Sequence, residues 1–161
     1  MIKKIGLLTL IISLFLSLGA VSAQSSNIAV NSESEKVFET KLYRVTDPSN
    51  PNSLGGVEVG GTASLECKNM GSKTASCDWR ITMTDKKAKI INVDTFLMWQ
   101  DGVKTVFRYG TYGVPTSVGN QEDHTFKYAG EYSVIFGGSV GTTKGVYTTA
   151  PPITKYVTVT E

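Results

Sequence analysis

The chain has 161 residues, with 16 lysines and arginines against 14 aspartates and glutamates. Lys3 and Lys4 alone account for this basic excess, so the rest of the chain is formally neutral. Neutrality argues against nucleic acid as a partner, because binding a polyanion draws on an excess of Lys and Arg. One histidine and two cysteines are too few ligands for a structural zinc site, and we expect no metal and no cofactor.

The N-terminus has the features of a secretion signal. Lys3 and Lys4 precede an uncharged apolar run over residues 5–18, and small residues lead to Ala23 before Gln24. This order is typical of a cleavable signal peptide over residues 1–23. An uncleaved anchor is the alternative, but the run is only marginally long for a hydrocarbon core of about 30 Å. The sequence predicts a secreted, extracytoplasmic product with no stable membrane anchor after signal cleavage.

Residues 24–35 are polar and lack a sustained period, which predicts a partly disordered leader before a single domain over residues 36–161. In that domain, apolar and polar residues alternate in short runs separated by turn formers, the pattern of β-strands. The expected strands are 36–45, 62–67, 77–84, 90–99, 103–109, 124–126, 131–136 and 153–159. We expect the Gly-rich segments 110–121 and 137–152 to be connections. The predicted fold class is all-β, an antiparallel two-sheet sandwich of about seven to eight strands.

Cys67 and Cys77 both fall on the apolar phase of their predicted strands. In an exported chain, an even pair at short spacing indicates a disulfide. Metal ligation is the alternative, and it would need more ligands than the chain offers.

Two stretches resemble the immunoglobulin-like and polycystic-kidney-disease-repeat group of β-sandwiches, as found in secreted bacterial proteins. His124-Thr125-Phe126, followed by Gly130-Glu131-Tyr132-Ser133-Val134, is similar to the penultimate-strand signature of that repeat. Gly60 to Cys67, followed by Trp79, is similar to an immunoglobulin strand B and the core tryptophan of strand C.

This resemblance implies a structural role for two residues. Trp79 would lie in the core, and Tyr132 would form a corner in which its hydroxyl bonds nearby backbone. Cys77 comes too early to be the strand-F cysteine, whose place is taken by Val134. The resemblance therefore implies an adhesive or spacer domain that lacks the usual bridge between strands B and F.

No catalytic motif stands out, and the chain is not expected to be an enzyme. His124 is the only histidine, so a Ser-His-Asp or Cys-His mechanism would have to use it. The candidate ligand contacts are Trp99, Tyr109, Tyr112 and Tyr147, since planar rings stack on sugars or anchor protein partners, although core packing is the alternative.

The expected function is a non-enzymatic binding or adhesion module for an extracellular protein or glycan. The alternatives are a small exported hydrolase or toxin-like effector that uses His124, and a structural spacer.

Overall fold

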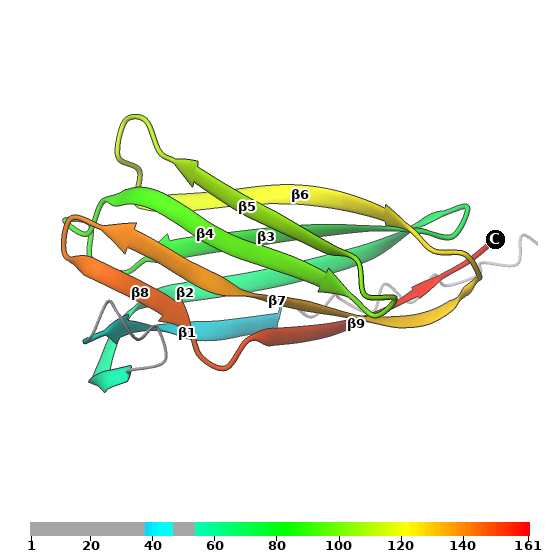
Figure 1. Ribbon diagram of the computed structural model, residues 1–161, viewed down its shortest axis with the longest axis horizontal. Coiled ribbons are helices and arrows are strands. Elements are labelled where there is room, and N and C mark those ends of the chain that lie inside the picture. Colours follow the sequence, from blue (N-terminus) through cyan, green and yellow to red (C-terminus); the bar gives the residue numbers. More distant parts are fainter. Residues whose placement is uncertain (1–37, 47–53) are drawn as a thin grey trace, which may run out of the picture. The chain divides into compact units, whose positions relative to one another are not determined.

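The computed structural model describes residues 38–46 and 54–161, which form nine β-strands (Figure 1). They are β1 (Phe38–Val45), β2 (Leu54–Gly71), β3 (Thr74–Met83), β4 (Ile90–Trp99), β5 (Lys104–Gly110), β6 (Ser117–Thr125), β7 (Gly130–Thr142), β8 (Gly145–Thr149) and β9 (Ile153–Val159). All strand pairs are antiparallel, and no residue of the two described ranges is helical. The expected all-β antiparallel class is confirmed. The predicted signal peptide and leader lie outside the described residues.

The strands form one continuous ladder in the order β5-β4-β7-β8-β1-β2-β3-β6. β7 is long enough to pair with two strands on one side, β9 along its first half and β8 along its second. β8 also pairs with β1, so the two sheets expected from the sequence are joined by backbone hydrogen bonds. The ladder curls until its two end strands come within side-chain reach, and Thr105 Oγ1 of β5 donates a 3.2 Å hydrogen bond to Glu122 Oε1 of β6.

The inward faces of the strands enclose one hydrophobic core. Trp79 of β3 has 0% exposure; its ring stacks on Phe136 with centroids 5.1 Å apart and is tilted against Phe107 at 5.2 Å. The other large side chains that are fully buried are Trp99, Leu42, Leu65, Ile81, Met83, Ile90, Leu97, Val93, Val134 and Val140.

Cys67 and Cys77 lie directly opposite each other on β2 and β3, and their sulfurs are bonded. Both residues are buried on the inward face. The disulfide expected from the sequence is therefore present, and it fixes the register of the β2–β3 pair.

The Gly-rich segments expected to be connections are partly strands. β6 begins at Ser117, β7 continues to Thr142, and β8 follows. The glycines of β7 serve close packing rather than chain reversal. A Cβ on Gly137 would lie 3.0 Å from the Phe96 ring, and a Cβ on Gly138 would lie 2.4 Å from the backbone oxygen of Asp94. Glycine inside a strand marks such close approaches.

Candidate functional site

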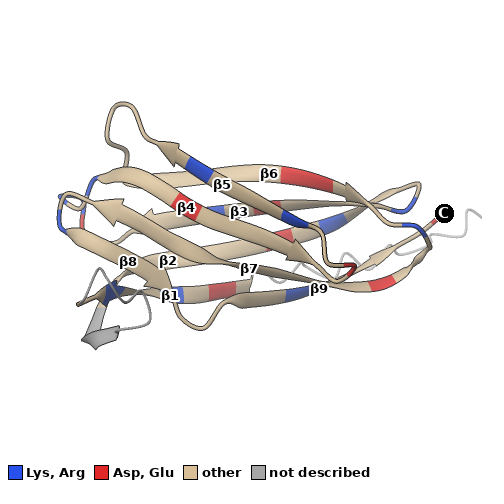
Figure 2. Cartoon of the chain, in the orientation of Figure 1, with Lys and Arg blue, Asp and Glu red and all other residues tan. Residues whose placement is uncertain are grey.

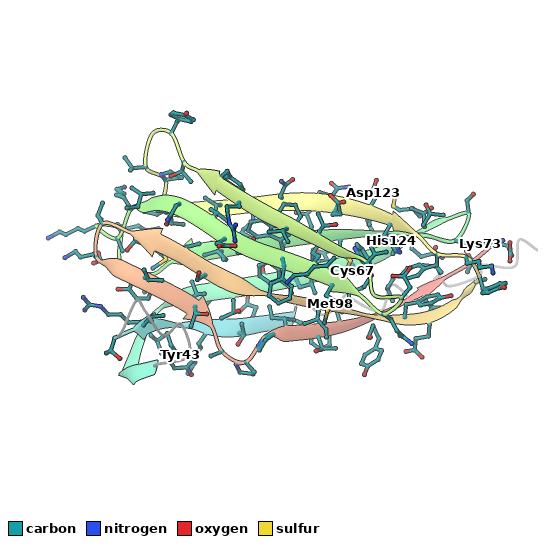
Figure 3. All side chains as sticks on the ribbon, in the orientation of Figure 1. Tyr43, Cys67, Lys73, Met98, Asp123 and His124 are labelled. Carbon is teal, nitrogen blue, oxygen red and sulfur yellow. A yellow bond between two sulfur atoms is a disulfide. The ribbon has the colours of Figure 1, made fainter. Side chains whose placement is uncertain are left out.

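The single histidine lies where the two ends of the curled ladder meet. His124 Nε2 donates a hydrogen bond to Asp101 Oδ2 over 2.7 Å, and Asp101 belongs to the turn between β4 and β5. The imidazole stacks on Trp99 with centroids 4.9 Å apart and meets the edge of Phe126 at 4.7 Å. We call these four residues the His124 latch; Figure 3 labels His124 near the end of β6.

Hydrogen bonds favour the ionised form of the Asp101 carboxyl. Burial by itself raises the pKa of this carboxyl, but the bonds from His124 and from the Val103 N–H, with the attraction of His124, bring the pKa below its ordinary value of 3.8. Oδ1 accepts the Val103 N–H over 3.2 Å, so both carboxylate oxygens are engaged. The Asp101 carboxylate on the β4–β5 turn therefore binds the imidazole of His124.

A His–Asp pair can orient an imidazole for acid–base catalysis. In that arrangement the second ring nitrogen faces a nucleophile. Within the described part of the chain, no hydroxyl or thiol is hydrogen-bonded to His124, whose side chain is 15% exposed. The contacts that are present join β6 to the β4–β5 turn.

The outward face of β2, β3 and β6 is polar. Its side chains are Glu66, Lys68, Ser76, Asp78, Arg80, Gln121 and Asp123. Gln121 Nε2 donates to Ser76 Oγ over 2.7 Å. Hydrogen bonds from Ser76 and Gln121, and then the charge of Lys68, lower the pKa of Asp123. Among the described residues, no three His, Cys, Asp or Glu side chains are placed to hold a metal ion.

On the outward face of β4, β5, β7 and β9, apolar side chains lie among polar and charged ones such as Asp94, Arg108 and Ser133. We define the apolar face by the outward side chains of Phe96, Met98, Val106, Ile135 and Tyr156. Three of these side chains are plainly exposed to solvent, with exposed fractions of 37% for Met98, 51% for Val106 and 62% for Tyr156. Figure 3 labels Met98 on β4.

Backbone register places four members of the apolar face in neighbouring rows, while Tyr156 of β9 lies opposite Ser133. One row across the sheet runs Lys104, Met98 and Ile135, and the next runs Val106, Phe96 and Gly137. The Phe96 ring lies across Gly137, and Lys104 Nζ sits 4.4 Å above that ring. Because Gly137 has no side chain, the Phe96 ring can lie over the backbone where β4 meets β7.

The candidate ligand contacts named from the sequence do not form one surface. Trp99 and Tyr147 are 1% and 3% exposed, because each lies on the inward phase of its strand, and they offer no surface ring. Tyr109 lies within β5 and is 37% exposed, and partial burial raises the pKa of its hydroxyl. Tyr112 is 100% exposed on the loop between β5 and β6.

Tyr132 is half-buried against the core. Its ring stacks on Phe126 with centroids 3.7 Å apart, and its hydroxyl donates to the carbonyl oxygen of Tyr128 over 2.9 Å. Tyr132 thus links the loop before β7 to the aromatic cluster of the His124 latch.

Sequence reasoning missed the apolar face, although the strand at 90–99 carried a signal for it. Residues 96–99 are apolar on both phases, since Leu97 and Trp99 point inward while Phe96 and Met98 point outward. A strand that is apolar on both phases is typical of a sheet covered on both faces.

Across residues 38–46 and 54–161, no helix is long and apolar enough to cross a membrane. No protein-family model and no curated protein matches the chain.

Proposed function

We propose that the chain is a secreted, non-enzymatic binding module that recognises an extracellular protein through the apolar face. One observation carries this proposal, namely the contrast between the two outward faces. An antiparallel sheet that meets only water presents polar side chains, as β2, β3 and β6 do. On the other face, Phe96, Met98, Val106 and Ile135 lie at neighbouring positions of β5, β4 and β7, and apolar side chains gathered in this way are typical of interaction sites.

The composition of the apolar face favours a protein partner over a glycan. Sugar sites rely on flat rings beside polar groups, and only two of the five members, Phe96 and Tyr156, have such rings. The other three, Met98, Val106 and Ile135, are aliphatic or thioether side chains. Charged groups flank these side chains, with Lys104 Nζ above the Phe96 ring and Arg108 paired with Asp94 over 2.9 Å. An apolar centre with a polar rim is the common anatomy of a protein–protein interface.

We further propose that the domain is a joined variant of the immunoglobulin-like sandwich and that it works outside the cytoplasm. Support for the sandwich comes from the buried Trp79 and from the bond between the Tyr132 hydroxyl and the backbone of Tyr128. The Cys67–Cys77 disulfide is compatible with an oxidising compartment. Intact-mass measurement of exported protein should give a chain that begins at Gln24, and a product that keeps residues 1–23 would contradict the proposal.

The binding test uses an array of extracellular proteins and glycans probed with the exported chain. We expect retention on protein spots, lost by at least about tenfold in Val106→Glu, because a charge buried in an interface is desolvated without a partner. Thr62→Glu is the matched control, since it adds the same charge to an exposed position on the opposite outward face. Equal losses in both variants, or retention on glycans alone, would refute the role of the apolar face.

A hydrolase that uses His124 is the second candidate, favoured by the 2.7 Å contact with Asp101. His124→Phe keeps a ring between Trp99 and Phe126 while it removes both nitrogens. A panel of ester, peptide and glycoside substrates would decide between the two functions. Turnover that disappears in His124→Phe would support the hydrolase, and no turnover by the parent would remove it.

A further inference from the structure

Three segments meet at the end of the domain where β4 begins. They are the turn at residues 84–89, the turn between β7 and β8, and the loop at residues 111–116. Hydrogen bonds hold the two turns together. Thr143 N donates to the carbonyl oxygen of Lys89 over 2.9 Å, and Thr143 Oγ1 donates to that of Lys87 over 2.9 Å. Lys89 N donates in return to Thr143 Oγ1 over 3.1 Å.

The loop at residues 111–116 is fixed to the same place. Thr111 N donates to the carbonyl oxygen of Ile91 over 3.0 Å, and Ile90 N donates to that of Pro115 over 2.8 Å. These bonds hold both ends of the loop at the start of β4, directly after Lys89. The three segments therefore form one end surface.

This end surface is rich in positive charge, as the blue turns near β4 and β8 in Figure 2 show. The two turns carry Lys86, Lys87, Lys89 and Lys144, and their one acid is Asp85. Asp85 Oδ1 accepts a hydrogen bond from the backbone N–H of Lys87 over 2.8 Å. Among the described residues, none of the four lysines has an ion-pair partner, in contrast to Lys73, which pairs with Glu161 over 2.9 Å.

Exposed apolar side chains belong to the same end of the domain. Tyr112 is fully exposed at the loop tip, and Ile91 and Val114 are 47% and 41% exposed. Val114 has a φ of 44°, a left-handed conformation that a β-branched residue rarely adopts. An apolar loop tip at the same end of the domain as lysines without ion-pair partners is suited to a surface that is negatively charged outside and apolar beneath.

We infer that this end of the domain docks on an anionic membrane surface, with the lysines on lipid phosphates and Tyr112 in the interfacial layer. Each lysine near such a surface changes partitioning by about fivefold, and tyrosine favours the boundary between headgroups and acyl chains. A soluble polyanion would satisfy the lysines but would leave the apolar tip in water. The formal neutrality of the chain is compatible with docking because the positive charge is gathered at one end.

This docking goes beyond the proposed binding function and leaves the apolar face accessible. The apolar face runs along the strands, whereas the lysine-rich surface lies across their ends. A domain standing on a membrane by this end would present Val106 and Met98 sideways to a partner.

The test is co-sedimentation of the exported chain with vesicles of phosphatidylglycerol and phosphatidylcholine in equal parts, against vesicles of phosphatidylcholine alone. We expect binding to the anionic vesicles only. The double variant Lys86→Gln, Lys87→Gln should lower partitioning by about 25-fold at low salt. Tyr112→Ser should also lower it, and its effect should persist near 1 M salt, where charges are screened beyond about 3 Å.

The opposite end of the domain supplies matched controls. Lys127 and Tyr128 are an exposed lysine and an exposed tyrosine on the β6–β7 loop. Lys127→Gln and Tyr128→Ser should leave partitioning unchanged. Equal binding to neutral vesicles would overturn the inference. So would tight binding to soluble polyphosphate with no effect of Tyr112→Ser, since that result would identify a polyanion site without a membrane component. Because these assays do not use the apolar face, their failure would leave the array result intact.

Discussion

Replacement of His124 should show how much the contact between the two ends of the ladder stabilises the domain. The imidazole has two aromatic neighbours, Trp99 at 4.9 Å and Phe126 at 4.7 Å, and such pairs contribute about 0.5 to 1.5 kcal/mol each. The hydrogen bond to Asp101 adds about 1 kcal/mol, because the carboxylate is partly exposed to solvent. His124→Ala should therefore lower the free energy of unfolding by about 2 to 4 kcal/mol.

Two partial replacements separate the contributions. His124→Phe keeps the ring and loses the hydrogen bond, so it should cost about 1 kcal/mol, and Asp101→Asn should cost a similar amount. Urea unfolding at neutral pH, followed by tryptophan fluorescence, measures all three variants beside the parent. If His124→Phe were as damaging as His124→Ala, ring packing would not stabilise the latch and the reasoning would be refuted.

The latch also predicts the sign of a pH effect. The folded pKa of Asp101 lies below its unfolded value of about 3.9. The stability that this carboxylate contributes is therefore complete above about pH 4 and is lost as the pH falls through the folded pKa. Below about pH 4, the parent should lose its advantage over Asp101→Asn. A difference between the two proteins that stayed constant down to pH 2 would contradict this assignment.

Further substitutions test the core and the close packing. Tyr132→Phe should cost about 1 kcal/mol through the lost hydroxyl bond, and Tyr132→Ala about 3 kcal/mol through a cavity, both measured by urea unfolding. Removal of the disulfide by Cys67→Ala with Cys77→Ala should cost at most about 3 kcal/mol, compared in the same assay with the parent before and after reduction. Gly138→Ala should prevent or severely weaken folding, seen as loss of the near-ultraviolet circular dichroism, because its Cβ would lie 2.4 Å from the backbone oxygen of Asp94. Parent-like unfolding of any of these proteins would count against the packing described for that residue.

Short-range patterns predicted much of the strand architecture. Alternation alone gives the bounds of β4 at Ile90–Trp99 and β9 at Ile153–Val159, because each strand has buried residues on one phase and turn formers at its ends. The phase of Cys67 and Cys77 predicts their pairing for the same reason. A side chain's inward or outward phase is a local property of the strand, and local properties can be read from a sequence.

What the sequence did not show depends on contacts between distant segments. The glycines of β7 read as a flexible connection, since nothing near them in sequence reveals that Phe96 and Asn92 occupy the space above Gly137 and Gly141. The pairing of β8 with both β7 and β1 is equally non-local. His124 was recognised as the only histidine, but its partner Asp101 lies 23 residues away and across the ladder.

The side-chain bridges between β5 and β6 have a consequence for how copies of the chain behave when crowded. Both strands end the ladder, and an unpaired strand edge is a template on which another chain can add and begin aggregation. On β6, however, the inward phase carries Asn120, Glu122 and His124 after the single apolar Val118. A strand added there would have to displace the Thr105–Glu122 bond and would desolvate the Glu122 carboxylate. The polar residues of β6 thus disfavour the addition of a second copy at this edge of the ladder.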